Sequence, residues 1–236
     1  IRDVIGPDEY KEHVDNNAYT NYMAHENMRL AAQVIACIRD EKKDIYGKIQ
    51  KLMQEEGTSL EQLEEELKDK MKKLYLPQPD EKTGIIPQFD GYFDLKEIDL
   101  SVYKNASVVG TIFHDYSGED VQGMQAGKQA DIVELLYQME DITTPDNKAK
   151  NYVYYEARTL HDSSLSKAIH SITACDLGME KEAYEMFMSA ALTDLGQEMK
   201  SSDAGIHSAN MGGVWQDVVM GFGGIRIRDG HLRIAP

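Results

Sequence analysis

Cysteine and positive charge are both scarce in this chain of 236 residues. Its two cysteines, Cys37 and Cys175, have no C-x-x-C spacing, which excludes a disulfide framework and favours a reducing compartment. Lys and Arg number 25 against 41 Asp and Glu, so the formal net charge is −16. Because nucleic acids and anionic membranes are bound by clustered cations, we expect neither a nucleic-acid partner nor a membrane partner.

Long apolar runs and several common site motifs are also lacking. No run approaches the roughly 20 apolar residues of a membrane helix, and no cationic stretch precedes an apolar one as in a signal peptide. The 7 histidines show no H-x-H or H-E-x-x-H spacing, so no metal site is expected. A P-loop and a G-x-S-x-G nucleophile elbow are absent from the sequence. The chain starts Ile1-Arg2-Asp3 without Met, so we expect a processed chain or a fragment.

The main pattern in the sequence is the helical spacing of its apolar residues. Apolar residues spaced as on one helix face, together with capping and stop signals, predict a series of helices. They are expected near residues 17–39, with a continuation of the same helix through the charged stretch 40–56, and near 59–76, 128–139, 146–155, 166–177, 181–195 and 214–222. Alternating residues on either side of Asp229-Gly230 predict a β-hairpin with a two-residue turn. The sequence therefore predicts an all-α fold with a short C-terminal β-hairpin.

A turn near the N-terminus carries a candidate general acid. Glu9 lies in the segment GPDEY, in the loop before the first predicted helix. A rigid turn fixes a carboxyl side chain, and nearby aromatic rings raise its pKa by desolvation, as acid catalysis requires. The alternative is a solvated turn residue. An aromatic Gly turn, Phe89-Asp90-Gly91-Tyr92, would suit a sugar ring beside such an acid, although most aromatic residues of the chain suit the core.

Three further segments are typical of sites for anions or hydroxyl groups. Lys128-Gln129 precede an apolar helix, the loop His161–Ser166 is rich in hydroxyls, and His207-Ser208 precede a Gly-Gly pair. The alternatives are an ordinary first helical turn for Lys128-Gln129 and a plain N-cap for Ser166.

In chain order, five segments resemble glycoside hydrolase family 65, the inverting α-glucoside phosphorylases. These segments are GPDEY with DNNAYTNYM, PQFDGY, KQADIV, YYEARTLHDSSLSKAIHSI and GIHSANMGGVWQDVVMGFGGIRI. The resemblance covers the chain apart from the charged stretch 40–76 and parts of 95–125. It implies the second half of an (α/α)6 barrel, at residues 1–222, and the start of a C-terminal β-domain, at 223–236.

The resemblance also implies a role for each candidate residue. Glu9 would protonate the glycosidic oxygen, and Lys128 and Gln129 would contact the glucosyl unit. Phosphate would attack in place of the water that an inverting hydrolase activates with a second carboxylate. The phosphate site would comprise hydroxyl and imidazole side chains: Ser163, Ser164, His207 and Ser208. Two positions depart from the family pattern, Gly127 before Lys-Gln and Ala157 in the E-x-R-T segment, and both concern local helix geometry.

We therefore expect phosphorolysis of an α-linked glucosyl disaccharide to β-glucose 1-phosphate by a cytoplasmic enzyme. Phosphate is a co-substrate, and no metal or organic cofactor is expected. The full-length enzyme is expected to be a homodimer, or this chain to associate with a missing N-terminal half and to be inactive alone. The stretch KEHVDNN favours trehalose- or nigerose-type members over maltose-type members. An acid trehalase-like hydrolase and a non-catalytic helical fragment are the alternatives.

Overall fold

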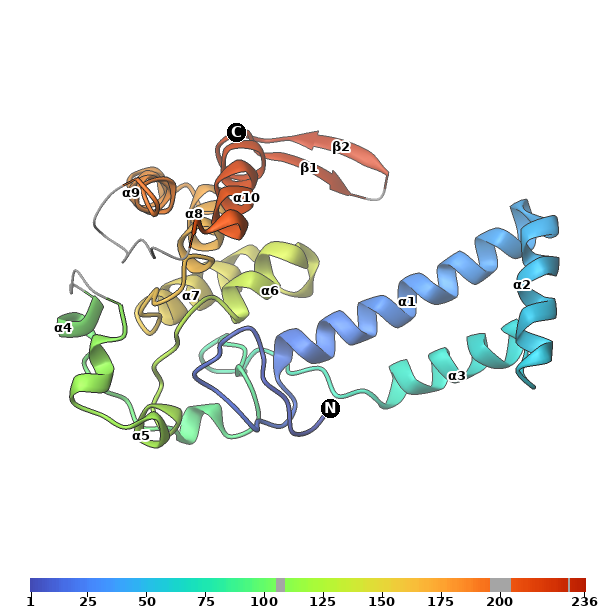
Figure 1. Cartoon of the computed structure of the whole chain (residues 1–236), viewed down its shortest axis with the longest axis horizontal. Coiled ribbons are helices and arrows are strands. Elements are labelled where there is room, and N and C mark those ends of the chain that lie inside the picture. Colours follow the sequence, from blue (N-terminus) through green and yellow to red (C-terminus); the bar gives the residue numbers. More distant parts are fainter. Residues whose placement is uncertain (105–108, 196–204, 229) are drawn as a thin grey trace. The chain divides into compact units, whose positions relative to one another are not determined.

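The computed structural model describes residues 1–104, 109–195, 205–228 and 230–236. It divides into two compact units: Ile1 with Thr20–Leu76, and Arg2–Tyr19 with Pro77–Pro236. Within these residues the regular elements are helices and one antiparallel hairpin of β1 (Ile225–Arg228) and β2 (His231–Ile234), as predicted (Figure 1). Asp229, the first residue of the predicted turn, lies outside the described residues. No helix of the described segments combines the length and apolar character needed to cross a membrane.

The smaller unit contains three helices: α1 (Ala18–Glu41), α2 (Lys43–Glu55) and α3 (Leu60–Lys73). The expected continuation of α1 through residue 56 is wrong, because Lys42 leaves the helical region and α2 starts afresh. Gly57 ends α2 with a positive φ of 78°, and the Ser59 side chain accepts a bond from Gln62 N that caps α3. In Figure 1, α2 runs across the ends of α1 and α3.

The larger unit contains the remaining helical elements and the hairpin. In chain order these elements are η1 (Tyr92–Asp94), α4 (Ser101–Lys104), η2 (Thr111–His114), α5 (Gly118–Gln122), α6 (Ile132–Gln138), η3 (Glu140–Ile142), α7 (Pro145–Glu156), α8 (Ser166–Asp176), α9 (Glu180–Ala191), α10 (Ser208–Gln216) and the π-helical turn η4 (Asp217–Phe222). Helix α8 is central, because it packs against α6, α7, α9, α10 and η4. Its side chains are mostly small or apolar, so nearly the whole surface of the helix can be buried.

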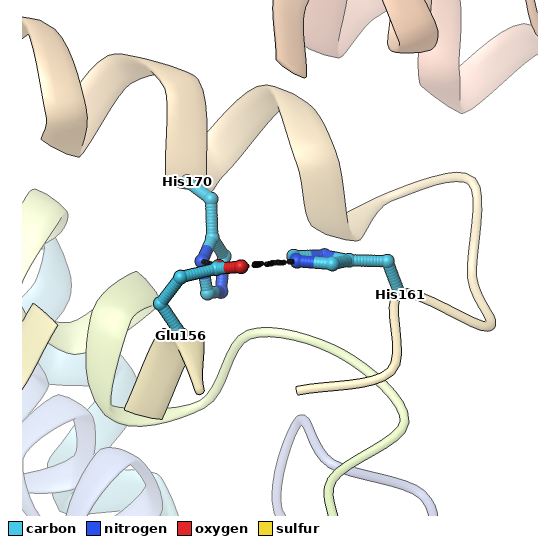
Figure 2. A group of neighbouring side chains, drawn as sticks. All are labelled: Glu156, His161 and His170. Carbon is cyan, nitrogen blue, oxygen red and sulfur yellow. Dashed lines mark hydrogen bonds and ion pairs between the residues drawn. The ribbon is translucent and has the colours of Figure 1, made fainter. Parts of the chain in front are cut away.

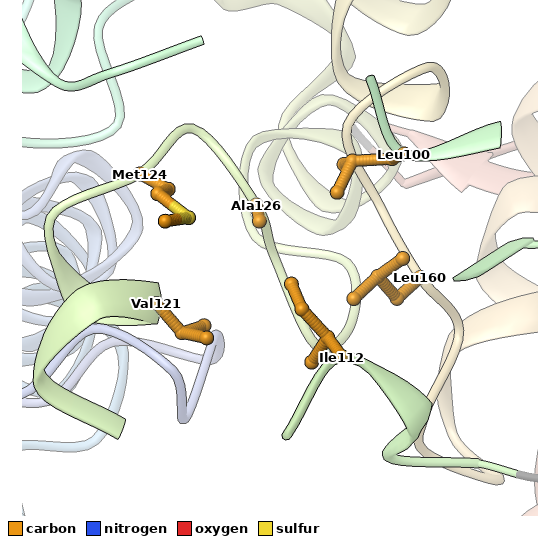
Figure 3. Packing of buried hydrophobic residues seen from close by; sticks show 6 residues of the cluster. All are labelled: Leu100, Ile112, Val121, Met124, Ala126 and Leu160. Carbon is orange, nitrogen blue, oxygen red and sulfur yellow. The ribbon is translucent and has the colours of Figure 1, made fainter. Parts of the chain in front are cut away.

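A hydrophobic cluster holds the irregular segment before α6 against the loop after α7. Its members are Leu100, Ile112, Val121, Met124, Ala126 and Leu160 (Figure 3). Buried apolar side chains of this kind contribute about 1.5–3 kcal/mol each. Although the segment has little regular structure, this cluster gives it a core of its own next to the loops that carry the candidate residues.

Buried aromatic rings form a second packed group in the larger unit. Phe89 and Tyr92 meet edge to face with centroids 5.4 Å apart, and Tyr92 lies 5.6 Å from Tyr155. Tyr92 is 2% exposed, so the aromatic Gly turn that we considered for a sugar ring belongs to the core. Gly91, with φ of 81°, makes the turn that brings both rings inward.

One arginine ties the hairpin to the helices. Arg226 on β1 is buried and donates to Glu140 at 3.0 Å and to Asp176 at 3.1 Å. Because two carboxylates satisfy its guanidinium, the charge is tolerated inside the protein. The predicted boundary at 222/223, between barrel and β-domain, remains a prediction.

Candidate functional site

Glu9 is the exposed carboxylate of a loop that is otherwise tightly held. Its side chain retains 57% of its exposure and forms an ion pair with Lys128 Nζ. The loop leaves no room at Gly6, where an added Cβ would lie 2.3 Å from Asn17 Nδ2. The fold thus holds the backbone of the turn and leaves the Glu9 carboxylate open to a ligand.

Asp8, the neighbour of Glu9, is almost wholly buried, and its carboxylate connects three segments through hydrogen bonds. One carboxylate oxygen accepts from Lys128 N at 2.8 Å and from Tyr10 N at 3.2 Å, and the other accepts from Gln88 Nε2 at 3.2 Å. Burial raises the pKa of Asp8 although these donors lower it. Asp8 therefore joins the Glu9 turn directly to the Lys128 backbone.

A second buried carboxylate, Asp131, lies next to Asp8. Its Oδ2 accepts from Asn17 Nδ2 at 3.0 Å, from Gln88 Nε2 at 3.3 Å and from Asp8 N at 3.4 Å. Burial, with the Asp8 carboxylate beside it, raises the pKa of Asp131 to about 8. Residue spacing did not predict this network, although its members lie in the segments DNNAY, PQFDGY and KQADIV.

Lys128 and Gln129 do reach the Glu9 turn, but not from a helix. Helix α6 starts at Ile132, so the expectation that the pair opens a helix is wrong. Both lie in a bend before it, where Gln129 Nε2 donates to Pro7 O and Lys128 pairs with Glu9. The structure therefore brings these three predicted site residues together.

The loop His161–Ser166 is tied to the same place. Tyr10 Oη donates to Asp162 Oδ2 at 2.8 Å, and Asp162 N donates to Lys128 O at 3.0 Å. Asp162 Oδ1 also accepts from Gly110 N at 2.9 Å. The acid turn, the Lys-Gln segment and the start of the serine loop therefore form one hydrogen-bonded network.

Three of the predicted phosphate residues, Ser164, His207 and Ser208, lie around α10, and Ser163 Oγ accepts from Leu165 N within the loop. Ser164 lines a groove of about 430 Å³ with Ala209 and Gly212 of that helix. His207 precedes α10 and its Nδ1 lies 2.6 Å from Asp194 Oδ1, while Ser208 is the first residue of α10. Within the described segments, no hydrogen bond or ion pair joins His207 or Ser208 to Ser163, Ser164 or Glu9.

Helix α10 begins earlier than predicted. Its first residue is Ser208, whereas periodicity placed the start at Val214. Gly212 and Gly213 consequently lie inside a helix and not in a loop open to a ligand. Gly213 instead allows close packing on α8, because an added Cβ would lie 3.1 Å from Ala168 Cβ.

A buried cluster of Glu156, His161 and His170 stands beside the serine loop (Figure 2). His161 Nε2 lies 3.1 Å and His170 Nδ1 lies 2.5 Å from Glu156 Oε2. These residue types can hold a metal ion, but the spacing of the three residues in the sequence matches no common metal-binding motif. That no metal is bound remains a prediction.

A groove beside the acid has the size of a sugar site. It measures about 730 Å³ and is lined by Glu9, Tyr10 and Phe113, among others. The Tyr10 and Phe113 rings meet edge to face with centroids 5.2 Å apart. Ligand sites usually measure about 300–1,000 Å³ and combine apolar walls with a few placed polar groups. The geometry suits protonation of a bound glycoside oxygen by Glu9.

The chain resembles known proteins along its whole length. The model for the glycosyl hydrolase family 65 central catalytic domain matches residues 1–216, and these include the charged stretch 40–76 that we had left outside the resemblance. A kojibiose phosphorylase of Halothermothrix orenii is 46% identical over 100% of this chain and 29% of its own length. For the kojibiose phosphorylase of Escherichia coli the identity is 39%, with the same coverage of 100% and 29%.

An α,α-trehalose phosphorylase of Thermoanaerobacter brockii is 37% identical over 100% of this chain and 30% of its own length. A solved structure described as a kojibiose phosphorylase from the human microbiome superposes with a TM-score of 0.80 at 31% identity. That superposition covers 100% of this chain and 33% of the other. The chain thus spans about 30% of the length of these relatives.

Proposed function

Because the chain belongs to glycosyl hydrolase family 65, we propose that its protein is an inverting phosphorylase of an α-linked glucosyl disaccharide. The observation that carries the proposal is the exposed Glu9 carboxylate beside a sugar-sized groove, with Lys128 next to it. The phosphorylases among the relatives support the same reaction class.

In the proposed reaction, the Glu9 carboxyl transfers its proton to the glycosidic oxygen as the bond from that oxygen to the anomeric carbon breaks. A phosphate oxygen attacks the same carbon from the opposite face, so the products are β-glucose 1-phosphate and the acceptor sugar. Lys128 and Gln129 would contact hydroxyls of the glucosyl unit. Hydroxyl and imidazole groups from Ser163, Ser164, His207 and Ser208 would hold the phosphate.

We propose kojibiose as the first substrate to test, in place of the trehalose or nigerose that the stretch KEHVDNN favoured. The kojibiose phosphorylases at 46% and 39% identity support this choice. The net charge of −16 and the two cysteines support a cytoplasmic location. A homodimer, and the absence of a metal or organic cofactor, stand as further parts of the proposal.

The test is an assay of the protein in its natural length with kojibiose, nigerose, trehalose and maltose, with and without phosphate. We expect β-glucose 1-phosphate from one disaccharide only when phosphate is present, and no effect of a metal chelator. Free glucose formed equally without phosphate would make the protein a hydrolase. Turnover of none of the sugars would favour the non-catalytic alternative.

A further inference from the structure

The Glu156 cluster joins the end of one helix to the start of the next across the serine loop. Glu156 is the last residue of α7, His161 begins the loop, and His170 lies on α8. Lys104 Nζ donates to Glu156 Oε1 at 2.7 Å. A buried carboxylate with an ammonium and two imidazoles around it is a fully partnered anion, which is the condition for keeping a charge inside a protein.

The hydrogen bonds of His161 determine which of its two ring nitrogens carries the proton. Burial lowers the pKa of His161 to about 4, so the ring is neutral near pH 7 and carries a single N–H. Burial raises the pKa of Glu156, but the two imidazoles outweigh this and hold it well below its usual range. An ionised carboxylate only accepts, so His161 Nε2–H donates to Glu156 and Nδ1 is an acceptor.

The acceptor nitrogen of His161 then closes the serine loop. His161 Nδ1 lies 2.8 Å from Ser166 Oγ, so the Ser166 hydroxyl donates to it. This bond joins the first and last residues of the loop. His161 also has a φ of 56°, a left-handed conformation that is strained for a residue other than glycine and persists only where neighbours hold it.

Ser163 and Ser164 lie between the two ends that this bond joins. Asp162, which directly precedes Ser163, is held in place by hydrogen bonds with Tyr10 and with the Lys128 carbonyl. Because both ends of the loop are held by hydrogen bonds, the two serine hydroxyls can take few positions. Binding groups at other ligand sites are preorganised by neighbouring residues in the same way.

Two other roles for the cluster fit the distances less well. Ser166, His161 and Glu156 are ordered like a hydrolase triad, but Ser166 is wholly buried, so its hydroxyl cannot reach a substrate. A divalent metal would have to compete with the Lys104 ammonium already 2.7 Å from Glu156. The 3.1 Å contact of His161 Nε2 with Glu156 Oε2 is that of a direct hydrogen bond, and His170 Nδ1 forms an ion pair with the same oxygen at 2.5 Å.

We propose that Glu156 is a positioning residue for phosphate recognition, acting through His161 and Ser166 on the loop that carries Ser163 and Ser164. The inference rests on the proposed phosphorylase function. It predicts that loss of the Glu156 charge weakens the use of phosphate while leaving the use of the disaccharide nearly unchanged.

The first experiment compares Glu156→Gln and Ser163→Ala with the unmodified protein in steady-state phosphorolysis. We expect both variants to raise KM for phosphate about tenfold, as loss of an orienting neighbour does at other sites, with KM for the disaccharide within about twofold. Glu182→Gln is the matched control, because that carboxylate lies on α9, which packs against α8, and accepts from Tyr152 Oη at 2.9 Å.

A second measurement reports on the cluster without reference to activity. Nitrogen NMR of the labelled histidines should show His161 with a protonated Nε2 and a bare Nδ1 in the unmodified protein, and a changed signal in Glu156→Gln. His161→Gln assigns the resonance. This readout remains informative if a variant loses stability, since it reports the tautomer directly.

The outcomes separate the two proposals. If the unmodified protein needs no phosphate, the phosphorylase proposal fails and the positioning role fails with it. If phosphate is required but Glu156→Gln keeps the normal phosphate KM, or loses phosphate and disaccharide recognition equally, only the positioning role is overturned. One equivalent of tightly bound metal, removed together with activity by a chelator, would also overturn it in favour of a metal site.

Discussion

A buried cation, as well as buried carboxylates, fixes the loop that carries Glu9. Lys11 Nζ donates to the carbonyls of Val121 and Met124, both at 2.6 Å, and to Gln122 O at 3.3 Å. Burial lowers the pKa of Lys11 to about 8. Because the loop is anchored by full hydrogen bonding, removal of the Glu9 carboxylate should leave the fold intact.

Glu9→Gln is therefore expected to abolish catalysis without unfolding the protein. General acid catalysis supplies about 10²–10⁴-fold, so we expect kcat for disaccharide phosphorolysis to fall by at least about 100-fold. The melting temperature should stay unchanged, because the side chain is largely exposed. Glu65→Gln, an exposed glutamate of α3, is the control. Near-normal turnover by Glu9→Gln would remove Glu9 from the mechanism.

Asp131→Asn is expected to change how stability depends on pH. The pKa of Asp131 is raised to about 8 in the folded state, whereas an unfolded Asp titrates near 3.9. The folded protein thus binds the extra proton between these values, and this contribution to stability is lost as the pH rises through about 8.

Between pH 6 and 9 the melting temperature of the unmodified protein should fall further than that of Asp131→Asn, because asparagine at this position cannot ionise. Thermal denaturation followed by circular dichroism at several pH values measures this. Asp141→Asn, an exposed carboxylate, should behave like the unmodified protein. Parallel pH curves for Asp131→Asn and the unmodified protein would contradict a raised pKa.

At the scale of helices, local signals predicted most long elements and failed where tertiary contacts decide. Ser59 and Gly178 marked helix ends correctly, because capping and positive φ are local properties. The short helices α4 and α5 had no periodicity to reveal them. Helix α10 was placed too late, since Gly212 and Gly213 suggested a loop but pack inside the helix against α8.

The candidate site was likewise predictable only in part. The motifs named the residues that meet at the Glu9 turn, namely Glu9, Lys128 and Gln129. Their assembly depends on contacts between distant segments, such as Tyr10 with Asp162, which no spacing encodes. The grouping of Glu156 with His170 was invisible for the same reason.

Helix α7 offers a test of such local signals. Thr144 Oγ1 accepts from Asn147 N at 3.2 Å, and Pro145 occupies the first helical position. Thr144→Ala should reduce the free energy of unfolding by about 1 kcal/mol, because an orphan N–H at the helix start loses its partner. Urea denaturation measures the change. Thr144→Ser keeps the hydroxyl and should be close to the unmodified protein; equal losses in both variants would show that the methyl group, not the cap, matters.

At the scale of the whole molecule, the two units differ sharply in charge. Residues 20–76 contain 11 acidic and 10 basic side chains, whereas the rest of the chain contains 30 acidic and 15 basic ones. The charged helices α2 and α3 are thus nearly neutral, and the larger unit carries almost all of the net negative charge. Mutual repulsion of like charges destabilises a compact state.

Added salt should therefore stabilise the protein. Screening acts over about 10 Å at 0.1 M ionic strength, and a gain of about 1 kcal/mol corresponds to about 3 °C for a chain of this size. We expect the melting temperature to rise by about that much between 10 and 300 mM sodium chloride in calorimetry. Potassium chloride should give the same rise, since the effect is one of ionic strength. A flat or falling curve would show that specific ion pairs outweigh the general repulsion.

The contrast between Asp8 and Glu9 has a consequence for how this turn tolerates variation. Asp8 is buried with three donors on its carboxylate, whereas Glu9 faces the groove. Consider a library of single variants that is sorted once for protein abundance and once for turnover. Variants at Asp8 should be rare among the abundant proteins. Changes at Glu9 should pass that sort and disappear only from the active pool. Two adjacent acids would thus fall into different phenotypic classes, one limiting how much protein accumulates and the other limiting what that protein does.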